Sequence, residues 1–200
     1  MASNNIENEI KLYVPDHEPV KRALETAGAS LKAARVFERN VRYDTPDQAL
    51  RPRGGVLRLR QDTRVRLTYK DGDRVVGEFG TSRFEAEVEV SDFDTMQTIL
   101  GKLGYRPFMG YEKYRTTYEL DDAEITLDEM PYGNFVEIEG EDTAIGQVME
   151  KLGLKHAPRF HASYVVLFEL VKQHLNLHFT DLSFENFKGI TVPLSAFAQE

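Results

Sequence analysis

The chain has 200 residues, carries a net charge of -8 and contains no cysteine. This length accommodates one domain, or one domain with an extension, and the lack of cysteine excludes disulfides and zinc–thiolate sites. The acidic balance argues against nucleic acid as a partner, because nucleic-acid binding usually rests on a basic surface. No apolar run approaches the roughly 20 residues that span a bilayer, and the N-terminal residues lack a basic-then-apolar signal pattern, so we expect a cytoplasmic protein without a membrane partner.

The first predicted element is a strand at residues 6–12, in which charged and apolar side chains alternate. Its charged positions are Glu7, Glu9 and Lys11. Residues two apart in a strand lie about 7 Å from each other on one face, so two carboxylates there can share a divalent cation beside a phosphate-binding lysine. For one strand taken alone, an amphipathic strand with a solvated face is the simpler interpretation.

The same alternation recurs along the chain, and each later strand carries charge of one sign. The basic positions are Arg58 and Arg60, Arg66 and Lys70, and Lys113 and Arg115, and the acidic ones are Glu85, Glu87 and Glu89, Asp128, and Glu137 and Glu139. Because like charges repel on a sheet face, an ordinary surface would mix the signs. An enclosed face with this many charges needs counter-ions, and a divalent cation with a polyanion would supply them.

Helices are predicted at residues 18–27, 92–103, 143–152 and 163–171. The first three have apolar residues at helical spacing, and each ends near a glycine that suits a C-terminal cap: Gly28, Gly104 and Gly153. Asp92 and Asp142 are the predicted N-caps of the second and third helices. These helices would cover the apolar side of strands whose charged side faces a lumen.

In this order, the motifs resemble those of the CYTH superfamily, also called triphosphate tunnel metalloenzymes. Glu7-Asn8-Glu9-Ile10-Lys11 has the family's ExExK signature. Further blocks follow in the family's order at residues 43–46, 57–60, 67–70, 83–87, 113–115, 127–128 and 135–139. The resemblance extends from about residue 6 to about residue 170.

This resemblance implies an α+β fold, in which an eight-stranded antiparallel β-barrel encloses a charged tunnel and helices pack outside. Residues 1–171 would form the tunnel domain. Residues 172–200 are too apolar for a disordered linker. This extension is expected to pack on the barrel, close one end of the tunnel or join a subunit contact, so a homodimer stays open.

The resemblance also implies the site residues. The phosphate ligands would be Lys11, Arg58, Arg60, Lys70, Lys113 and Arg115, and the residues that bind Mg²⁺ or Mn²⁺ would come from Glu7, Glu9, Glu85, Glu87, Asp128, Glu137 and Glu139. Glu7, Glu9, Lys11, Arg58, Arg60 and Lys70 are the predicted catalytic residues. Arg66 and Glu89 are additions from strand alternation, for which a supporting or outer role is as plausible. Arg42 and Arg83 either line the tunnel mouth or pair with acids.

The expected activity is metal-dependent hydrolysis of a small-molecule triphosphate, either inorganic tripolyphosphate or a nucleoside triphosphate. Three alternatives stay open: a class IV adenylate cyclase, a thiamine triphosphatase and a non-catalytic polyphosphate-binding module. Hydrolysis needs a water in line with the terminal phosphorus, whereas cyclisation needs the ribose 3'-hydroxyl in line with the α-phosphorus. The motifs do not distinguish these two poses.

Overall fold

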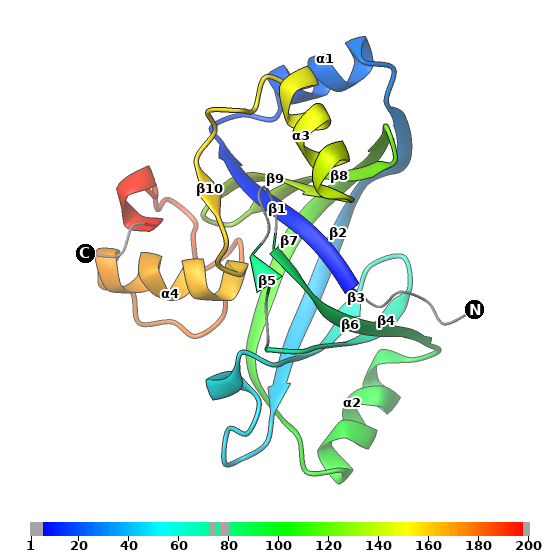
Figure 1. The fold of residues 1–200 in the computed structure, drawn as a ribbon. Coiled ribbons are helices and arrows are strands. Elements are labelled where there is room, and N and C mark those ends of the chain that lie inside the picture. Colours follow the sequence, from blue (N-terminus) through cyan, green and yellow to red (C-terminus); the bar gives the residue numbers. More distant parts are fainter. Residues whose placement is uncertain (1–5, 73–74, 77–80, 198–200) are drawn as a thin grey trace.

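The computed structural model describes residues 6–72, 75–76 and 81–197, and the side chains of residues 6, 7, 76 and 81 lie outside this description (Figure 1). The strands are β1 (Ile6–Val14), β2 (Ser30–Asp44), β3 (Val56–Gln61), β4 (Val65–Lys70), β5 (Val75–Val76), β6 (Thr81–Val90), β7 (Arg106–Leu120), β8 (Ala123–Met130), β9 (Gly133–Glu139) and β10 (Arg159–Phe160). The helices are α1 (Glu18–Thr26), α2 (Phe93–Lys102), α3 (Asp142–Lys151) and α4 (Tyr164–Leu175), with short 3-10 helices at Arg51–Arg53 and Leu194–Phe197.

Eight of the strands close into a ring in the order β1, β9, β8, β7, β2, β3, β4 and β6. The ring closes where residues 6–9 of β1 pair antiparallel with residues 81–84 of β6. The short strands β5 and β10 add to β6 and β1. A closed ring has an inner and an outer face, and successive side chains of every strand alternate between them.

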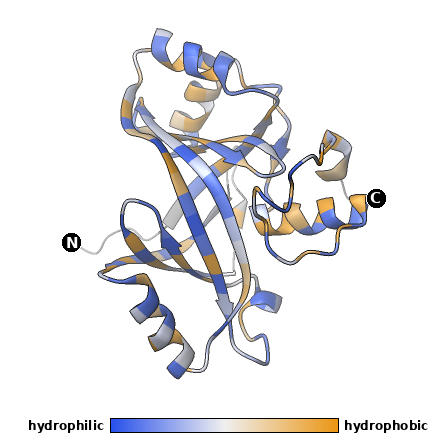
Figure 2. Ribbon diagram, turned by 180° about the vertical axis from the view of Figure 1, so that it is seen from behind, coloured by the Kyte–Doolittle hydropathy of each residue, from blue (hydrophilic) through white to orange (hydrophobic). Residues whose placement is uncertain are grey.

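Apolar side chains on the outer face form the core beneath the helices. Helices α1 and α3 pack on β1, β8 and β9, and α2 packs on β2 and β3. Leu12, Ile125 and Ile138 are fully buried under the first pair, and Leu59 is fully buried under α2. Hydrophobic and hydrophilic residues alternate along the strands in Figure 2. The predicted α+β class is confirmed, with antiparallel strands around a charged interior and helices outside.

Three predicted helix ends are confirmed. Gly28, Gly104 and Gly153 follow the last turns of α1, α2 and α3 with φ of +77°, +96° and +69°, in the left-handed region that glycine enters without a Cβ clash. The Asp92 cap is also confirmed, because Oδ1 of Asp92 accepts a hydrogen bond from the backbone N–H of Thr95 at 2.7 Å.

The predicted Asp142 cap is wrong. Helix α3 begins at Asp142 itself, and Glu141 occupies the cap position. The Asp142 carboxylate instead accepts a hydrogen bond from the Asn8 side-chain amide at 3.0 Å, so it ties α3 to β1. The fourth predicted helix runs beyond residue 171 to Leu175, and Ser163 caps its N-terminus.

The segment after α4 returns to the edge of β7, beside residues 110–112. Leu182 forms a parallel bridge with Tyr111, and its carbonyl accepts a hydrogen bond from the Glu112 N–H at 2.9 Å. Phe187 and Phe197 are buried in the apolar cluster that α4 shares with β7, β8 and β9. The predicted division at residue 171 stays a prediction, and α4 spans that position. Within the described ranges, every helix is too short or too polar to cross a bilayer.

Candidate functional site

The inner face of the ring surrounds a cavity of about 1260 Å³. All eight ring strands contribute to its lining, which includes twelve Lys or Arg and nine Asp or Glu side chains. The lining is therefore net positive, although the chain as a whole carries -8. A positive, partly enclosed cavity in an acidic protein concentrates anions at that place.

One group of charges surrounds Asp128, which is fully buried on β8. The Lys113 ammonium donates a hydrogen bond to Oδ2 of Asp128 at 2.9 Å, and the Arg115 Nε donates to Oδ1 at 2.6 Å. The Tyr164 hydroxyl of α4 donates to Oδ2 at 2.9 Å. Burial and the adjoining Asp128 carboxylate raise the pKa of Tyr164 well above its ordinary value, so its phenol keeps the proton that it donates.

Glu137 extends this group toward β1. Lys11 lies 2.9 Å from its Oε1, and Arg115 donates to its Oε2. Burial would raise the pKa of Glu137, but Lys11 and Arg115 outweigh burial and hold that pKa well below its usual range. Glu137 is therefore a carboxylate at neutral pH. It neutralises Lys11 and Arg115, two basic side chains that a phosphate could also bind.

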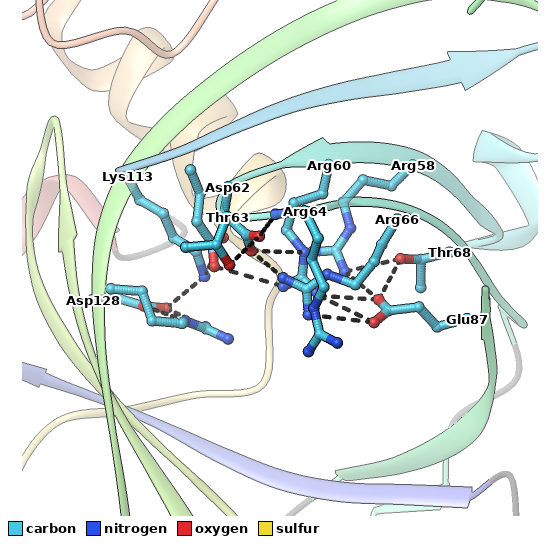
Figure 3. A network of polar contacts seen from close by, with 12 residues as sticks. Arg58, Arg60, Asp62, Thr63, Arg64, Arg66, Thr68, Glu87, Lys113 and Asp128 are labelled. Atoms are coloured by element: carbon cyan, nitrogen blue, oxygen red, sulfur yellow. Dashed lines mark hydrogen bonds and ion pairs between the residues drawn. The ribbon is translucent and has the colours of Figure 1, made fainter. Parts of the chain in front are cut away.

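A second group lies across the cavity around Glu87 of β6 (Figure 3). Arg60 Nη2 lies 3.0 Å from Glu87 Oε2, which also accepts a hydrogen bond from the Thr68 hydroxyl at 2.8 Å. Arg58 lies 3.7 Å from the same oxygen, and Arg66 lies 3.5 Å from the other. Four side chains from β3 and β4 thus converge on one carboxylate.

Glu38 of β2 joins the two groups and was missed in the sequence. It is 2% exposed and lies 3.5 Å from Lys113 and 3.7 Å from Arg60. Burial would raise its pKa, but Lys113, Arg115 and Arg60 lower it to about 2. Asp62 was also missed, and it pairs with Arg66. The signal for Glu38 was weak because Arg39 puts a charge on the opposite face of the same strand.

Among the residues whose side chains the structure describes, the predicted site residues are brought together, and Glu89 is the exception. The cavity lining contains Glu9, Lys11, Arg58, Arg60, Lys70, Glu85, Glu87, Lys113, Arg115, Glu137 and Glu139, together with Arg42, Arg66 and Arg83. Asp128 lies directly behind the lining and touches two of these bases. The side chain of Glu7 is outside the described residues. Glu89 does not join the buried acids, because it lies exposed and pairs with Arg64 at 3.3 Å.

The carboxylate oxygens of the cavity lining are suitable ligands for a hard divalent cation. Glu9 on β1 lies directly opposite Glu139 on β9, and Glu139 lies opposite Glu124 on β8. All three line the cavity, and carboxylate oxygens are the ligands that Mg²⁺ and Mn²⁺ prefer. Within the part of the chain that the structure describes, no three acids or histidines already converge on one point. Several acids pair with bases instead, as Glu85 does with Lys70.

A closed ring of antiparallel strands around this cationic cavity defines a tunnel-like domain. The family model of the CYTH domain matches residues 5–156, and the chain therefore belongs to the CYTH family. The resemblance predicted from the sequence motifs is confirmed.

Individual relatives agree with this assignment. A protein of Methanocaldococcus jannaschii, provisionally named as an adenylate cyclase, is 29% identical over 148 residues, which cover 73% of this chain and 81% of that protein. A Pyrococcus horikoshii structure shares 26% identity with a TM-score of 0.65, covering 82% of this chain and 98% of that one. A Hippeastrum protein, provisionally named as an adenylyl cyclase and described as having a dominant triphosphatase activity, has the same fold at 18% identity and a TM-score of 0.63, covering 82% and 94% of the two chains.

Proposed function

We propose that this chain hydrolyses a triphosphate, either inorganic tripolyphosphate or a nucleoside triphosphate, inside the ring with a divalent cation. The observation that carries this proposal is the placement of bases on facing walls of one net-positive cavity. Lys11, Lys113 and Arg115 come from β1 and β7, whereas Arg58 and Lys70 come from β3 and β4. A linear triphosphate between them would meet cations on both sides.

The acids and bases of the cavity give a mechanism for substrate capture. Without an anion, the bases are neutralised by Glu87, Asp128 and Glu137. A triphosphate competes with these acids, because Arg can bind phosphate oxygens through two parallel hydrogen bonds and Lys acts as a point charge. Phosphoryl transfer depends mainly on positioning and on stabilising charge at the phosphoryl oxygens, which these bases would do.

Glu9, Glu139 and the predicted partner Glu7 are the residues that would hold Mg²⁺ or Mn²⁺. Bound there, the cation would supply Lewis-acid polarisation of the phosphoryl oxygens. A carboxylate released from its base would be placed to orient the attacking water. Glu87 fits that role because it lines the cavity and lies within 3.7 Å of three arginines.

Cyclisation of ATP is the second candidate, and the name of the M. jannaschii relative favours it. The lining argues for hydrolysis. Tyr111 and Tyr164 line it, and both are buried with hydroxyls in hydrogen bonds to Arg58 and Asp128. The exposed ring of the described lining is the imidazole of His161, so the lining offers adenine or thiamine no exposed phenyl, phenol or indole face.

The test supplies tripolyphosphate, ATP and thiamine triphosphate in turn with Mg²⁺ or Mn²⁺, and measures phosphate, pyrophosphate and cyclic AMP. We expect phosphate release from tripolyphosphate or ATP, which stops when the metal is removed. Cyclic AMP with pyrophosphate from ATP would refute the proposal in favour of a cyclase. Phosphate release from thiamine triphosphate alone would identify the thiamine alternative, and binding without turnover would identify a non-catalytic module.

A further inference from the structure

Arg42 of β2 is a buried guanidinium without an acidic partner. It is 8% exposed and lines the cavity. Its Nε makes no hydrogen bond, and no carboxylate of the described residues forms an ion pair with it. Its guanidinium carbon lies 5.8 Å from the centroid of the Phe108 ring, and its charge interacts with the Tyr111 side chain.

The neighbours of Arg42 add positive charge. Arg42 lies directly opposite Arg58 in the β2–β3 register, and Cβ atoms of such cross-strand pairs are about 5 Å apart. Burial lowers the pKa of Arg42 to about 10, with Tyr111 opposing the shift and Arg58 and Arg83 adding to it, so Arg42 remains charged at neutral pH. Like charges that face each other across two strands destabilise a sheet unless an anion lies between them.

Arg58 differs from Arg42 in having partners. It donates to the Tyr111 hydroxyl at 3.2 Å and to the Thr68 hydroxyl at 3.2 Å, and Glu87 lies 3.7 Å away. Asn40, two residues before Arg42 on the same strand face, is fully buried, and neither atom of its amide group has a hydrogen-bond partner. Arginine Nε atoms without a hydrogen bond also occur on β3 and β4, but on β2 the unmet hydrogen bonds coincide with a guanidinium that has no acidic partner among the described residues.

We propose that Arg42 binds a phosphoryl group of the substrate and forms with Arg58 an anion subsite in addition to the six predicted phosphate ligands. The charge and planar shape of the guanidinium fit phosphate oxygens, and burial excludes the water that would otherwise solvate it. The subsite extends the phosphate-binding wall along β2, past the position of Glu38. This inference rests on the proposed triphosphate substrate, but it concerns binding and not turnover.

The experiment measures binding of inorganic tripolyphosphate by calorimetry at neutral pH, in buffer freed of divalent metals so that no hydrolysis occurs. Arg42→Met keeps the aliphatic packing and removes the charge, and we expect binding at least roughly tenfold weaker, which is about 1.4 kcal/mol. Arg39→Met is the matched control, because Arg39 is exposed on the opposite face of the same strand, where it packs on Phe93. The control should bind as the unmodified chain does.

Thermal unfolding separates a ligand role from a structural one. Removing an uncompensated buried charge should leave the ligand-free melting temperature of Arg42→Met unchanged or raised. The rise in melting temperature that tripolyphosphate produces should shrink in the same variant. If Met prevents folding, Arg42→Gln supplies a neutral polar side chain for the same binding measurement.

Binding of tripolyphosphate by the neutral variant within about threefold of the unmodified chain would overturn the subsite. Absence of tripolyphosphate binding by the unmodified chain would overturn it too. The two proposals fail separately. Normal hydrolysis with unchanged binding by the Arg42 variants refutes only the subsite, whereas binding that depends on Arg42 without any turnover refutes only the hydrolase.

Discussion

Replacing Glu38 by Gln removes the buried carboxylate that joins the two charged groups of the cavity. The pKa of Glu38 is lowered from 4.5 to about 2 by the bases around it. Each pKa unit corresponds to about 1.4 kcal/mol, so the ionised carboxylate contributes roughly 3 kcal/mol to the free energy of unfolding at neutral pH. For a chain of this size, we expect Glu38→Gln to lower the melting temperature by roughly 10 °C.

The pH dependence of this loss follows from the direction of the shift. The folded-state pKa is depressed, so the stabilisation is fully present above the unfolded-state pKa and is lost as the pH falls through the folded-state value. Urea titrations of both proteins should differ by roughly 3 kcal/mol near pH 7 and by about 1 kcal/mol near pH 3. The partners that hold the carboxylate are Lys113 and Arg60.

The control for this experiment is Glu119→Gln, which removes an exposed acid that pairs with Lys32 near the end of β7. Exposed ion pairs contribute little, so this variant should unfold almost as the unmodified chain does. A Glu38 difference that stays constant between neutral and acidic pH would refute the reasoning. So would a loss of tripolyphosphate affinity in Glu38→Gln, because removing a competing acid should leave that affinity unchanged or raise it.

Four further variants test the roles of individual residues. Glu7→Gln combined with Glu9→Gln should abolish metal-dependent turnover and leave the circular-dichroism spectrum intact, and unchanged turnover would contradict the proposed metal site. Arg58→Ala or Lys70→Ala should weaken tripolyphosphate binding by roughly 10- to 100-fold, since a hydrogen bond to a charged group contributes about 1.5–3 kcal/mol. Normal kinetics in both variants would show that Arg58 and Lys70 are not phosphate ligands. Tyr164→Phe should lower the free energy of unfolding, measured in urea, by about 1 kcal/mol, because Asp128 loses one of several hydrogen bonds. An unchanged unfolding midpoint would show that this hydrogen bond does not stabilise the fold.

The sequence predicts those parts of the fold that depend on local patterns. Alternation at Arg58 and Arg60 or at Glu137 and Glu139 indicates which side of a strand is charged, and a strand has only two sides. Gly104 after α2 likewise indicates a helix end from one residue's backbone freedom. These signals need no knowledge of what lies across the ring.

The pairing of charges depends on ring closure and could not be predicted strand by strand. Glu38 meets Lys113 because β2 pairs with β7, and Lys113 follows Glu38 by 75 positions in the chain. Asp142 failed as a predicted cap for the same reason, since Asn8 from the first strand binds its carboxylate. Tyr164 follows the matched family region, and no strand pattern marks a helix residue that reaches Asp128.

The paired acids compensate the positive charge of the cavity lining. An isolated buried cation is costly, and each base that faces an acid avoids that cost. Those acids are the same residues that a divalent cation would use once phosphate has taken over the bases. Binding of anion and cation should therefore support each other. The phosphate draws the bases away from the acids, and the divalent cation draws the acids away from the bases, so each ligand frees the side chains that the other one binds. Arg42 stands apart from this exchange among the described residues, since it has no acid to give up, and it gains the most from an incoming phosphate.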